Sequence, residues 1–165
     1  MNIVLIGFMG SGKTTIGKAL SSQKGFQLID TDEMIEKEYS MTIKDIFSSY
    51  GEARFREMEK RAIEQLQGID NHVISVGGGA VMFYDNLAAL KKVGITVFLD
   101  APLNKIILNL RGKFRPLVGN TIEEDKLQKL LESRYLTYKK ADVVINTEAL
   151  DIQQTVDAVI KQLGI

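Results

Sequence analysis

The chain has 165 residues, of which 45% are hydrophobic and 25% are charged, and its 21 basic side chains are balanced by 21 acidic ones. These values are typical of one soluble globular domain, and the balanced charge excludes an overall basic field of the kind that attracts nucleic acid. With no cysteine and a single histidine, His72, the chain also lacks the residues for disulfides, thiolate chemistry, cysteine-based zinc sites and two-histidine metal sites.

No apolar run approaches the roughly 20 residues that cross a membrane. The N-terminal segment MNIVLIG carries no basic leader before its apolar stretch, so it does not resemble a signal peptide. No heptad repeat or long apolar stripe predicts a partner chain. We therefore expect a cytoplasmic monomer that contacts neither a membrane nor nucleic acid.

Short apolar runs alternate with longer helical patterns along the whole chain. Five runs rich in β-branched residues predict strands at 2–6, 26–29, 72–76, 95–99 and 142–145. Their nearly continuous apolar character is typical of parallel strands buried on both faces. Helical patterns lie at 13–24, 32–38, 42–50, 52–67, 83–92, 103–111, 122–140 and 151–163. This alternation predicts one α/β three-layer domain over residues 1–165.

Residues 7–14, GFMGSGKT, match the pattern G-x-x-x-x-G-K-[ST] between a predicted strand and a predicted helix. The glycines allow the backbone to curl so that its N–H groups face phosphate oxygens, and the helix start adds the positive end of its dipole. We expect Lys13 to reach the β- and γ-phosphates of a nucleotide and the Thr14 hydroxyl to hold Mg²⁺. The expected phosphate site comprises Gly10, Ser11, Gly12, Lys13, Thr14 and Thr15.

Asp30 and Asp32 follow the second predicted strand, in QLIDTDEMI. The pattern Asp-Thr-Asp suits a helix cap as well as a metal site, so this segment alone leaves both possibilities open. In an extended chain, alternate side chains point to the same side, and the two carboxylates would then face one cleft together. That cleft would lie beside the phosphate loop.

The segment SVGGGAV, 75–81, places three glycines directly after the third predicted strand. Glycine lets the backbone approach a ligand closely and offers N–H donors without side chains in the way. A loose connection from strand to helix explains this segment equally well.

The helical pattern at 52–67 places Glu52, Arg56 and Glu59 on one face by their spacing. We expect most charges of this helix to be solvated, as in an ordinary surface helix. Arg56 beside Phe55 is the exception, because a planar guanidinium binds a carboxylate through two N–H groups and an aromatic ring suits a ring-shaped ligand.

The segment RGKFRPLVG, 111–119, has three cations, no acid and an internal proline, which makes it a poor helix and a poor strand. Charge clusters usually form solvated surface. Because a phosphate loop is present, we favour a mobile lid whose arginine would stabilise the charge on a transferring phosphoryl group.

Together these stretches resemble the shikimate kinase family. The matching pieces are GFMGSGKTT, DTD, DIFSSYGEARFREMEKRA, VGGGAV, RPL and SRYLTY, which extend from residue 3 to about residue 145. The resemblance implies a P-loop fold with a five-stranded parallel sheet flanked by helices, a substrate-binding region at about 31–60 and a mobile lid at about 111–119. It also implies Mg²⁺-dependent phosphoryl transfer from ATP to the 3-hydroxyl of shikimate, in aromatic amino-acid biosynthesis.

The resemblance also implies individual roles. The expected catalytic residues are Lys13, Asp32 and Arg115. The expected substrate-binding residues are Asp32, Phe47, Phe55, Arg56, Gly77, Gly78, Gly79 and Arg134. Arg111 and Arg115 join the phosphate loop at the nucleotide, while Thr14 and Asp30 are expected at the metal. Because the only histidine lies at the entry of the third predicted strand rather than at its exit, Asp32 is the available base for the acceptor hydroxyl. The segment INTEALD, 145–151, has no diagnostic feature, so the adenine contacts stay unassigned.

Two other functions fit part of the pattern. Another small-metabolite or nucleotide kinase, such as a gluconate or nucleoside-monophosphate kinase, would also use arginines for an anionic acceptor. A regulatory nucleotide-binding module would need Lys13 and Thr14 but would have no use for Asp32 or for Phe55 beside Arg56.

Overall fold

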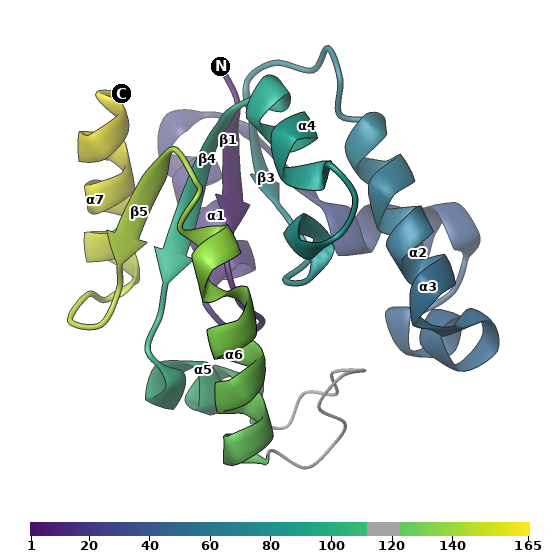
Figure 1. Cartoon of the computed structure of the whole chain (residues 1–165). Helices are drawn as coiled ribbons and strands as arrows, with labels where there is room; N and C mark the ends of the chain where they lie inside the picture. The colour runs from purple at the N-terminus through teal and green to yellow at the C-terminus, as the bar shows by residue number, and fades with distance from the viewer. Residues whose placement is uncertain (112–122) are drawn as a thin grey trace.

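The computed structural model describes residues 1–111 and 123–165. In this part of the chain, five parallel strands form one sheet in the order β2-β3-β1-β4-β5 (Figure 1). The strands are β1 (Ile3–Ile6), β2 (Gln27–Asp30), β3 (His72–Ser75), β4 (Ile95–Asp100) and β5 (Val143–Asn146). The five predicted strands and the α/β three-layer arrangement are confirmed.

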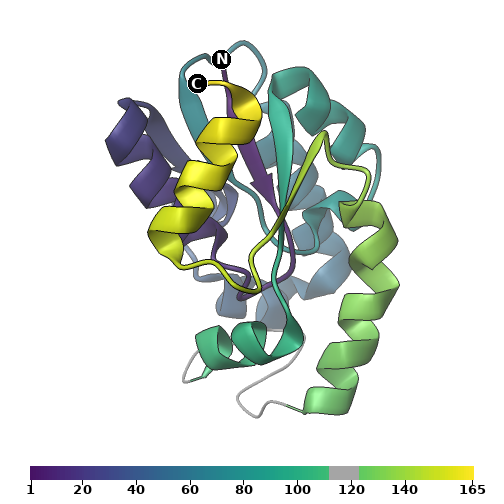
Figure 2. The same ribbon diagram turned by 90° about the vertical axis from the view of Figure 1, so that its left-hand side faces the viewer.

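Helices cover both faces of the sheet (Figures 1 and 2). They are α1 (Lys13–Lys24), α2 (Thr31–Tyr39), α3 (Ile43–Glu64), α4 (Asn86–Val93), α5 (Leu103–Leu110), α6 (Glu124–Tyr138) and α7 (Ile152–Leu163), with a short 3₁₀ turn at Ala80–Met82. No helix in the described ranges is both long and apolar enough to cross a membrane.

Alternation along β1 divides the core between the two faces. Ile3 and Leu5 pack with side chains of α1 and α7, whereas Val4 and Ile6 pack with side chains of α4, α6 and the end of α3. Because successive side chains of a strand point to opposite faces, one four-residue strand contributes to both layers of the core.

The prediction that every strand is buried on both faces is wrong for β2 and β5. All four residues of β1 are buried, but β2 has no fully buried residue and β5 has only Ile145. These are the two outer strands of the sheet, where neighbouring elements cover the side chains less completely. Apolar content alone did not separate outer strands from central ones.

Helix α3 consists of two arms that meet at Gly51. This residue has φ 78° and ψ 174°, which is outside the helical region and is accessible to glycine without steric cost. The predicted helices at 42–50 and 52–67 are therefore confirmed as the two arms of α3. Together with α2 they enclose a small core of their own, formed by Ile35, Ile46, Phe55, Met58 and Ala62.

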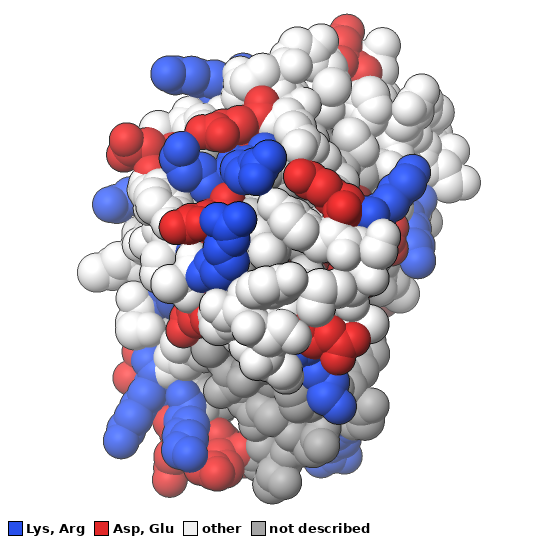
Figure 3. Space-filling view, turned by 90° about the vertical axis from the view of Figure 1, so that its right-hand side faces the viewer, with Lys and Arg blue, Asp and Glu red and all other residues white. Residues whose placement is uncertain are grey.

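The surface on the α2–α3 side carries charges of both signs. In Figure 3, lysine and arginine side chains are interspersed with aspartate and glutamate, with no large area of one sign on the described part of this face. This agrees with the equal numbers of acidic and basic residues in the sequence.

Asp142, the residue before β5, accepts hydrogen bonds from the start of β4. Oδ2 of Asp142 accepts hydrogen bonds from the backbone N–H of Thr96 at 2.9 Å and from its hydroxyl at 2.7 Å. Thr96 is fully buried. The carboxylate thus supplies an acceptor at a point where β5 has not yet begun to pair with β4.

Asp142→Ala is therefore expected to lower the free energy of unfolding by about 1–3 kcal/mol, because two buried donors of Thr96 lose their acceptor. Urea denaturation measures the change. Asp157→Ala, which removes an exposed carboxylate from α7, is the control and should stay within about 0.5 kcal/mol of the wild type. Equal stability of the two variants would contradict this role of Asp142.

Candidate active site

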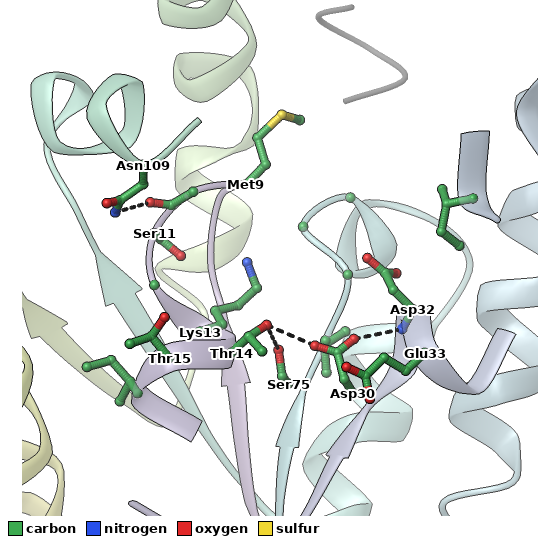
Figure 4. Close-up of a pocket in the computed structure, with 18 of the residues that line it drawn as sticks. Met9, Ser11, Lys13, Thr14, Thr15, Asp30, Asp32, Glu33, Ser75 and Asn109 are labelled. Atoms are coloured by element: carbon green, nitrogen blue, oxygen red, sulfur yellow. Dashed lines mark hydrogen bonds between the residues drawn. The ribbon is translucent and has the colours of Figure 1, made fainter. Parts of the chain in front are cut away.

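A cavity of about 1090 Å³ lies at the carboxyl edge of the sheet (Figure 4). The phosphate loop follows β1, Asp30 ends β2, and the three glycines follow β3, so three predicted segments meet at this edge. Parallel sheets bind ligands at the carboxyl ends of their strands. The cavity wall is completed by residues of α3, α5, α6 and the turn before α7.

The phosphate loop is held in shape by its own lysine and by α5. Lys13 Nζ donates to the carbonyl oxygens of Gly7 at 2.9 Å and Phe8 at 3.0 Å. Asn109 of α5 donates to the carbonyl of Gly10 at 2.8 Å. Helix α1 begins at Lys13, so its N-terminus points the positive end of its dipole at this loop, as phosphate binding requires.

Thr14, Asp30 and Ser75 form a group of oxygen atoms beside the phosphate loop (Figure 4). The Thr14 hydroxyl donates to Asp30 Oδ2 at 2.9 Å and lies 3.3 Å from the Ser75 hydroxyl. Because its proton is directed to Asp30, Thr14 Oγ1 keeps lone pairs for a cation. In the described ranges, no three carboxylate or histidine side chains gather as metal ligands. The group fits Mg²⁺, which usually takes few protein oxygens and completes its shell with water and phosphate.

Asp30 and Asp32 are not both on extended chain, so the reason given for their common orientation is wrong. Asp30 ends β2 and caps α2, since its Oδ1 accepts a hydrogen bond from the backbone N–H of Asp32 at 3.0 Å. Asp32 belongs to the first turn of α2. Both carboxylates nevertheless line the cavity, so Asp30 is a helix cap and a cavity residue at once.

Two of the three glycines, Gly77 and Gly79, lie directly against charged side chains. A Cβ at Gly77 would lie 2.8 Å from both Asp32 Oδ1 and Glu59 Oε1, and a Cβ at Gly79 would lie 2.7 Å from two nitrogens of Arg56. Real Cβ atoms do not approach this closely. The loop therefore needs glycine so that side chains of this chain can reach its backbone, a use that we did not anticipate.

Arg56 is buried and fixed by several partners. Its Nη1 donates to Glu59 Oε2 at 2.7 Å, and its Nη2 donates to Glu52 Oε1 at 3.0 Å. The guanidinium also lies 4.5 Å from the centroid of the Phe83 ring. The predicted common face of Glu52, Arg56 and Glu59 is confirmed. These contacts hold the Arg56 side chain at the wall of the cavity.

Two aromatic rings and a second buried arginine also line the cavity. Phe47 and Phe55 pack with their ring centroids 4.7 Å apart, and both line the cavity. Arg134 of α6 is 5% exposed, and within the described part of the chain its Nη1 has no hydrogen-bond partner. A buried guanidinium nitrogen without a partner is costly, so Arg134 is well suited to bind an anionic ligand.

The carboxyl group of Glu59 has a raised pKa. Burial raises the pKa of Glu59 to about 7, the carboxylate of Asp32 adds to the rise, and Arg56 opposes it. A glutamate that is only 2% exposed, beside a second carboxylate, is thus balanced mainly by one arginine. The part of the cavity lined by α2, α3 and α6 thus combines two acids with two arginines, and Glu59 and both arginines are buried.

Known proteins match this chain over nearly its whole length. A model of the shikimate kinase family matches residues 9–164. Among curated relatives, the shikimate kinase of Thermodesulfovibrio yellowstonii is 41% identical over 98% of this chain and 94% of that protein. The shikimate kinase of Caldicellulosiruptor bescii is 42% identical over 96% of this chain and 93% of that protein. The chain belongs to the shikimate kinase family.

Solved structures of the family have the same fold as this chain. A shikimate kinase from Acinetobacter baumannii in complex with shikimate superposes with a TM-score of 0.91 and 34% identity, over 98% of this chain and 92% of that one. The shikimate kinase of Bacteroides thetaiotaomicron gives 0.90 and 35%, over 100% and 99% of the two chains. A deoxyadenosine kinase from M. mycoides, at 0.66 and 17% identity, shares the P-loop fold.

The cavity brings together most of the residues predicted from the resemblance to shikimate kinases. Its wall includes Gly10, Ser11, Gly12, Lys13, Thr14, Thr15, Asp30, Asp32, Phe47, Phe55, Arg56, Gly77, Gly78, Gly79 and Arg134. Arg111 is the exposed cap residue at the end of α5 and is not among the described residues of this wall. Arg115 and the rest of the predicted lid, apart from Arg111, lie outside the described residues. Their roles stay predictions.

The structure adds residues that sequence reasoning missed. Lys105 of α5 donates to the carbonyls of Thr147 at 2.6 Å and Leu150 at 2.7 Å, and all three residues line the cavity near Asn109. This contact ties α5 to the turn before α7, which contains part of the segment INTEALD. The carbonyl partners are backbone atoms, so no side-chain pattern in that segment could have revealed them.

The raised pKa of Glu59 predicts a specific pH dependence of stability. A carboxyl group that holds its proton more tightly in the folded state contributes stability below its unfolded pKa of 4.5, and this contribution is lost as the pH rises to about 7. Relative to Glu59→Gln, the free energy of unfolding of the wild type should fall by about 3 kcal/mol over this interval. Denaturant titrations of both proteins across this pH range measure it.

Glu52→Gln is the matched control for this experiment. Glu52 also bonds to Arg56, but its side chain is 46% exposed, so its removal should leave the pH profile of the wild type nearly unchanged. A difference between wild type and Glu59→Gln that does not vary with pH would contradict the raised pKa.

Proposed function

We propose that this chain is a shikimate kinase that transfers the γ-phosphoryl group of ATP to the 3-hydroxyl of shikimate. The observation that carries the proposal is that one cavity connects the phosphate loop to two buried arginines and two aromatic rings. This combination suits a small, carboxylated, ring-shaped acceptor held beside the nucleotide. Membership of the family and the shikimate bound in the Acinetobacter baumannii relative support it. We further propose that the chain acts as a monomer in the cytoplasm.

At the nucleotide, the phosphate loop and the N-terminus of α1 bind the phosphates of ATP. Lys13 moves from the carbonyls of Gly7 and Phe8 to the β- and γ-phosphates, a short change for a flexible side chain. Thr14 and Asp30 hold Mg²⁺, Asp30 through water. When bound, Mg²⁺ neutralises charge on the β- and γ-phosphate oxygens. Arg111 and Arg115, from the predicted lid, add positive charge at the same phosphates.

At the acceptor, Arg56 and Arg134 bind the shikimate carboxylate, and Phe47 and Phe55 contact the ring. An arginine can bind a carboxylate through two parallel N–H groups, and contacts from two arginines fix the orientation of the ring. Because Arg56 is already held by Glu52 and Glu59, little side-chain entropy is lost when the acceptor binds. The glycines at 77–79 leave their backbone accessible along this side of the cavity.

In the chemical step, the 3-hydroxyl oxygen of shikimate forms a bond to the γ-phosphorus while the bond from that phosphorus to the β,γ-bridging oxygen breaks. The electron pair of the broken bond leaves with ADP, and the hydroxyl proton passes to the carboxylate of Asp32. Positioning of the two substrates in line supplies much of the rate. Asp32 is suited to the proton transfer because its side chain lines the cavity and lies against the glycine loop, two residues after Asp30.

The proposal is tested by incubating the chain with Mg-ATP and an acceptor panel of shikimate, gluconate and nucleoside monophosphates. Shikimate should be the preferred acceptor, Lys13→Met should abolish turnover, and Asp32→Asn should lower kcat by about 10²- to 10⁴-fold. Preference for another acceptor would favour the rival kinase. Tight ATP binding without any acceptor turnover, unchanged by Asp32→Asn, would favour a regulatory module.

A matched pair of arginine variants tests the acceptor site itself. Arg56→Ala should raise KM for shikimate by about 30-fold or more, since it removes a buried charge-assisted contact, and should change KM for ATP much less. Arg54→Ala removes an exposed arginine of the same helix that pairs with Glu57, and it should leave both constants unchanged. Circular dichroism verifies folding. Equal effects of the two variants on shikimate would contradict the assignment.

A further inference from the structure

Tyr138 is the last residue of α6 and makes one contact with the glycine loop. Its hydroxyl donates to the carbonyl oxygen of Gly78 at 2.6 Å. The side chain is completely buried, and its ring stacks on Phe98 of β4 with the centroids 5.1 Å apart. Burial raises the pKa of Tyr138 to about 12, so the hydroxyl remains a neutral donor throughout the working pH range of proteins.

The direction of this hydrogen bond determines the direction of the next N–H group. The chain has no cis peptide bond in its described part, so the C=O of Gly78 and the N–H of Gly79 lie in one peptide plane and point in opposite directions. Tyr138 lies in the core and does not line the cavity, whereas Gly79 does. A carbonyl held toward Tyr138 therefore directs the Gly79 N–H away from the core.

The same peptide is packed closely on its other neighbours. The Cα of Gly78 lies against the backbone of Met9 in the phosphate loop, where a Cβ would be 3.0 Å from the Met9 nitrogen, and Gly79 lies against the guanidinium of Arg56. This peptide therefore lies between the phosphate loop and Arg56. A rotation of the Gly78–Gly79 peptide would consequently move a donor beside the carboxylate-binding arginine.

We propose that Tyr138 is a positioning residue of the acceptor site, whose hydrogen bond to Gly78 holds the Gly79 N–H toward the acceptor beside Arg56. The inference rests on the proposed function, because it takes shikimate as the acceptor. Tyr138 touches neither substrate and acts through the glycine loop. Arg134 lies one turn earlier on α6, so the same helix supplies a direct ligand and the support for a backbone donor.

Tyr135 provides a matched control. It lies on the same helix and its ring also contacts Phe98, with the centroids 5.9 Å apart. Its hydroxyl, however, donates to Asp100 Oδ2 at 2.9 Å, at the end of β4, and not to the glycine loop. Tyr138→Phe and Tyr135→Phe thus remove the same atom from the same helix and the same aromatic cluster.

The experiment compares steady-state kinetics and shikimate calorimetry of the wild type, Tyr138→Phe and Tyr135→Phe, with the unfolding temperature of each. In Tyr138→Phe, KM and Kd for shikimate should rise about 5- to 20-fold while KM for ATP stays within about twofold, since a buried carbonyl loses its donor and the loop can rotate. Tyr135→Phe should keep both constants. A purely structural role would lower the unfolding temperature without separating the two substrates.

Each remaining outcome has a defined meaning. If the wild type does not phosphorylate shikimate, the proposed function fails and not the positioning role alone. If Tyr138→Phe turns over shikimate with unchanged KM, the positioning role is overturned while the proposed function stands. Should Tyr138→Phe fail to fold, the amide resonance of Gly79 in the wild type decides the question. It should shift when shikimate is added, and a resonance unaffected by shikimate would overturn the proposal.

Discussion

The acceptor side of this protein depends on the absence of side chains at one loop. At Gly77 and Gly79, two carboxylates and a guanidinium lie so close to the backbone that a Cβ could not be added without movement of Asp32, Glu59 or Arg56. Those three side chains come from α2 and α3, while the loop follows β3. The glycines therefore allow two helices to be brought against the end of the central sheet.

This arrangement produces a preorganised but electrostatically strained pocket. Glu59 is buried beside Asp32 and is held mainly by Arg56, so its carboxylate is less favourable than in water. Arg134 adds a second buried guanidinium. Guanidinium groups fixed before the acceptor arrives reduce the entropic cost of binding, and an anionic acceptor would give Arg134 Nη1 the partner that it lacks in the described part of the chain. Strain of this kind is common where pKa values are shifted at functional sites.

The two halves of the cavity are joined by backbone contacts. Asn109 binds the Gly10 carbonyl, Lys105 binds the turn before α7, and Tyr138 binds the Gly78 carbonyl. These bonds fix parts of each half, and the two halves meet where Gly78 packs against the backbone of Met9. Because the γ-phosphoryl group must meet the acceptor hydroxyl in line, errors of about 1 Å in either half reduce the rate strongly.

Sequence reasoning succeeded where the signal is local. The phosphate loop was identified by four fixed positions between a strand and a helix, and the common face of Glu52, Arg56 and Glu59 followed from helical spacing. The two arms of α3 were also predicted, as separate helical patterns at 42–50 and 52–67, and the structure places the break at Gly51 between them.

It failed where the answer depends on which elements meet in space. The extended-chain argument for Asp30 and Asp32 was wrong, because α2 begins at Thr31, one residue before the predicted helical pattern, and Asp30 caps it by accepting a hydrogen bond from the N–H of Asp32. From the sequence, Glu59 could not be distinguished from an ordinary surface glutamate, because its burial depends on the packing of α3 against the glycine loop. Lys105 and Tyr138 donate to backbone carbonyls, and every residue has a carbonyl, so the sequence does not show which ones are bound.

Binding of shikimate and ATP to Gly79→Ala, measured separately by titration calorimetry, tests the dependence on this loop most directly. Gly79 has φ −93° and ψ −12°, which alanine adopts without strain, so the added Cβ against Arg56 is the only change. We expect shikimate to bind at least about 10-fold more weakly, since the guanidinium that we propose to bind its carboxylate is displaced, while the Kd for ATP stays within about twofold. A folded Gly79→Ala protein that binds shikimate as tightly as the wild type would contradict the central role of the glycine loop.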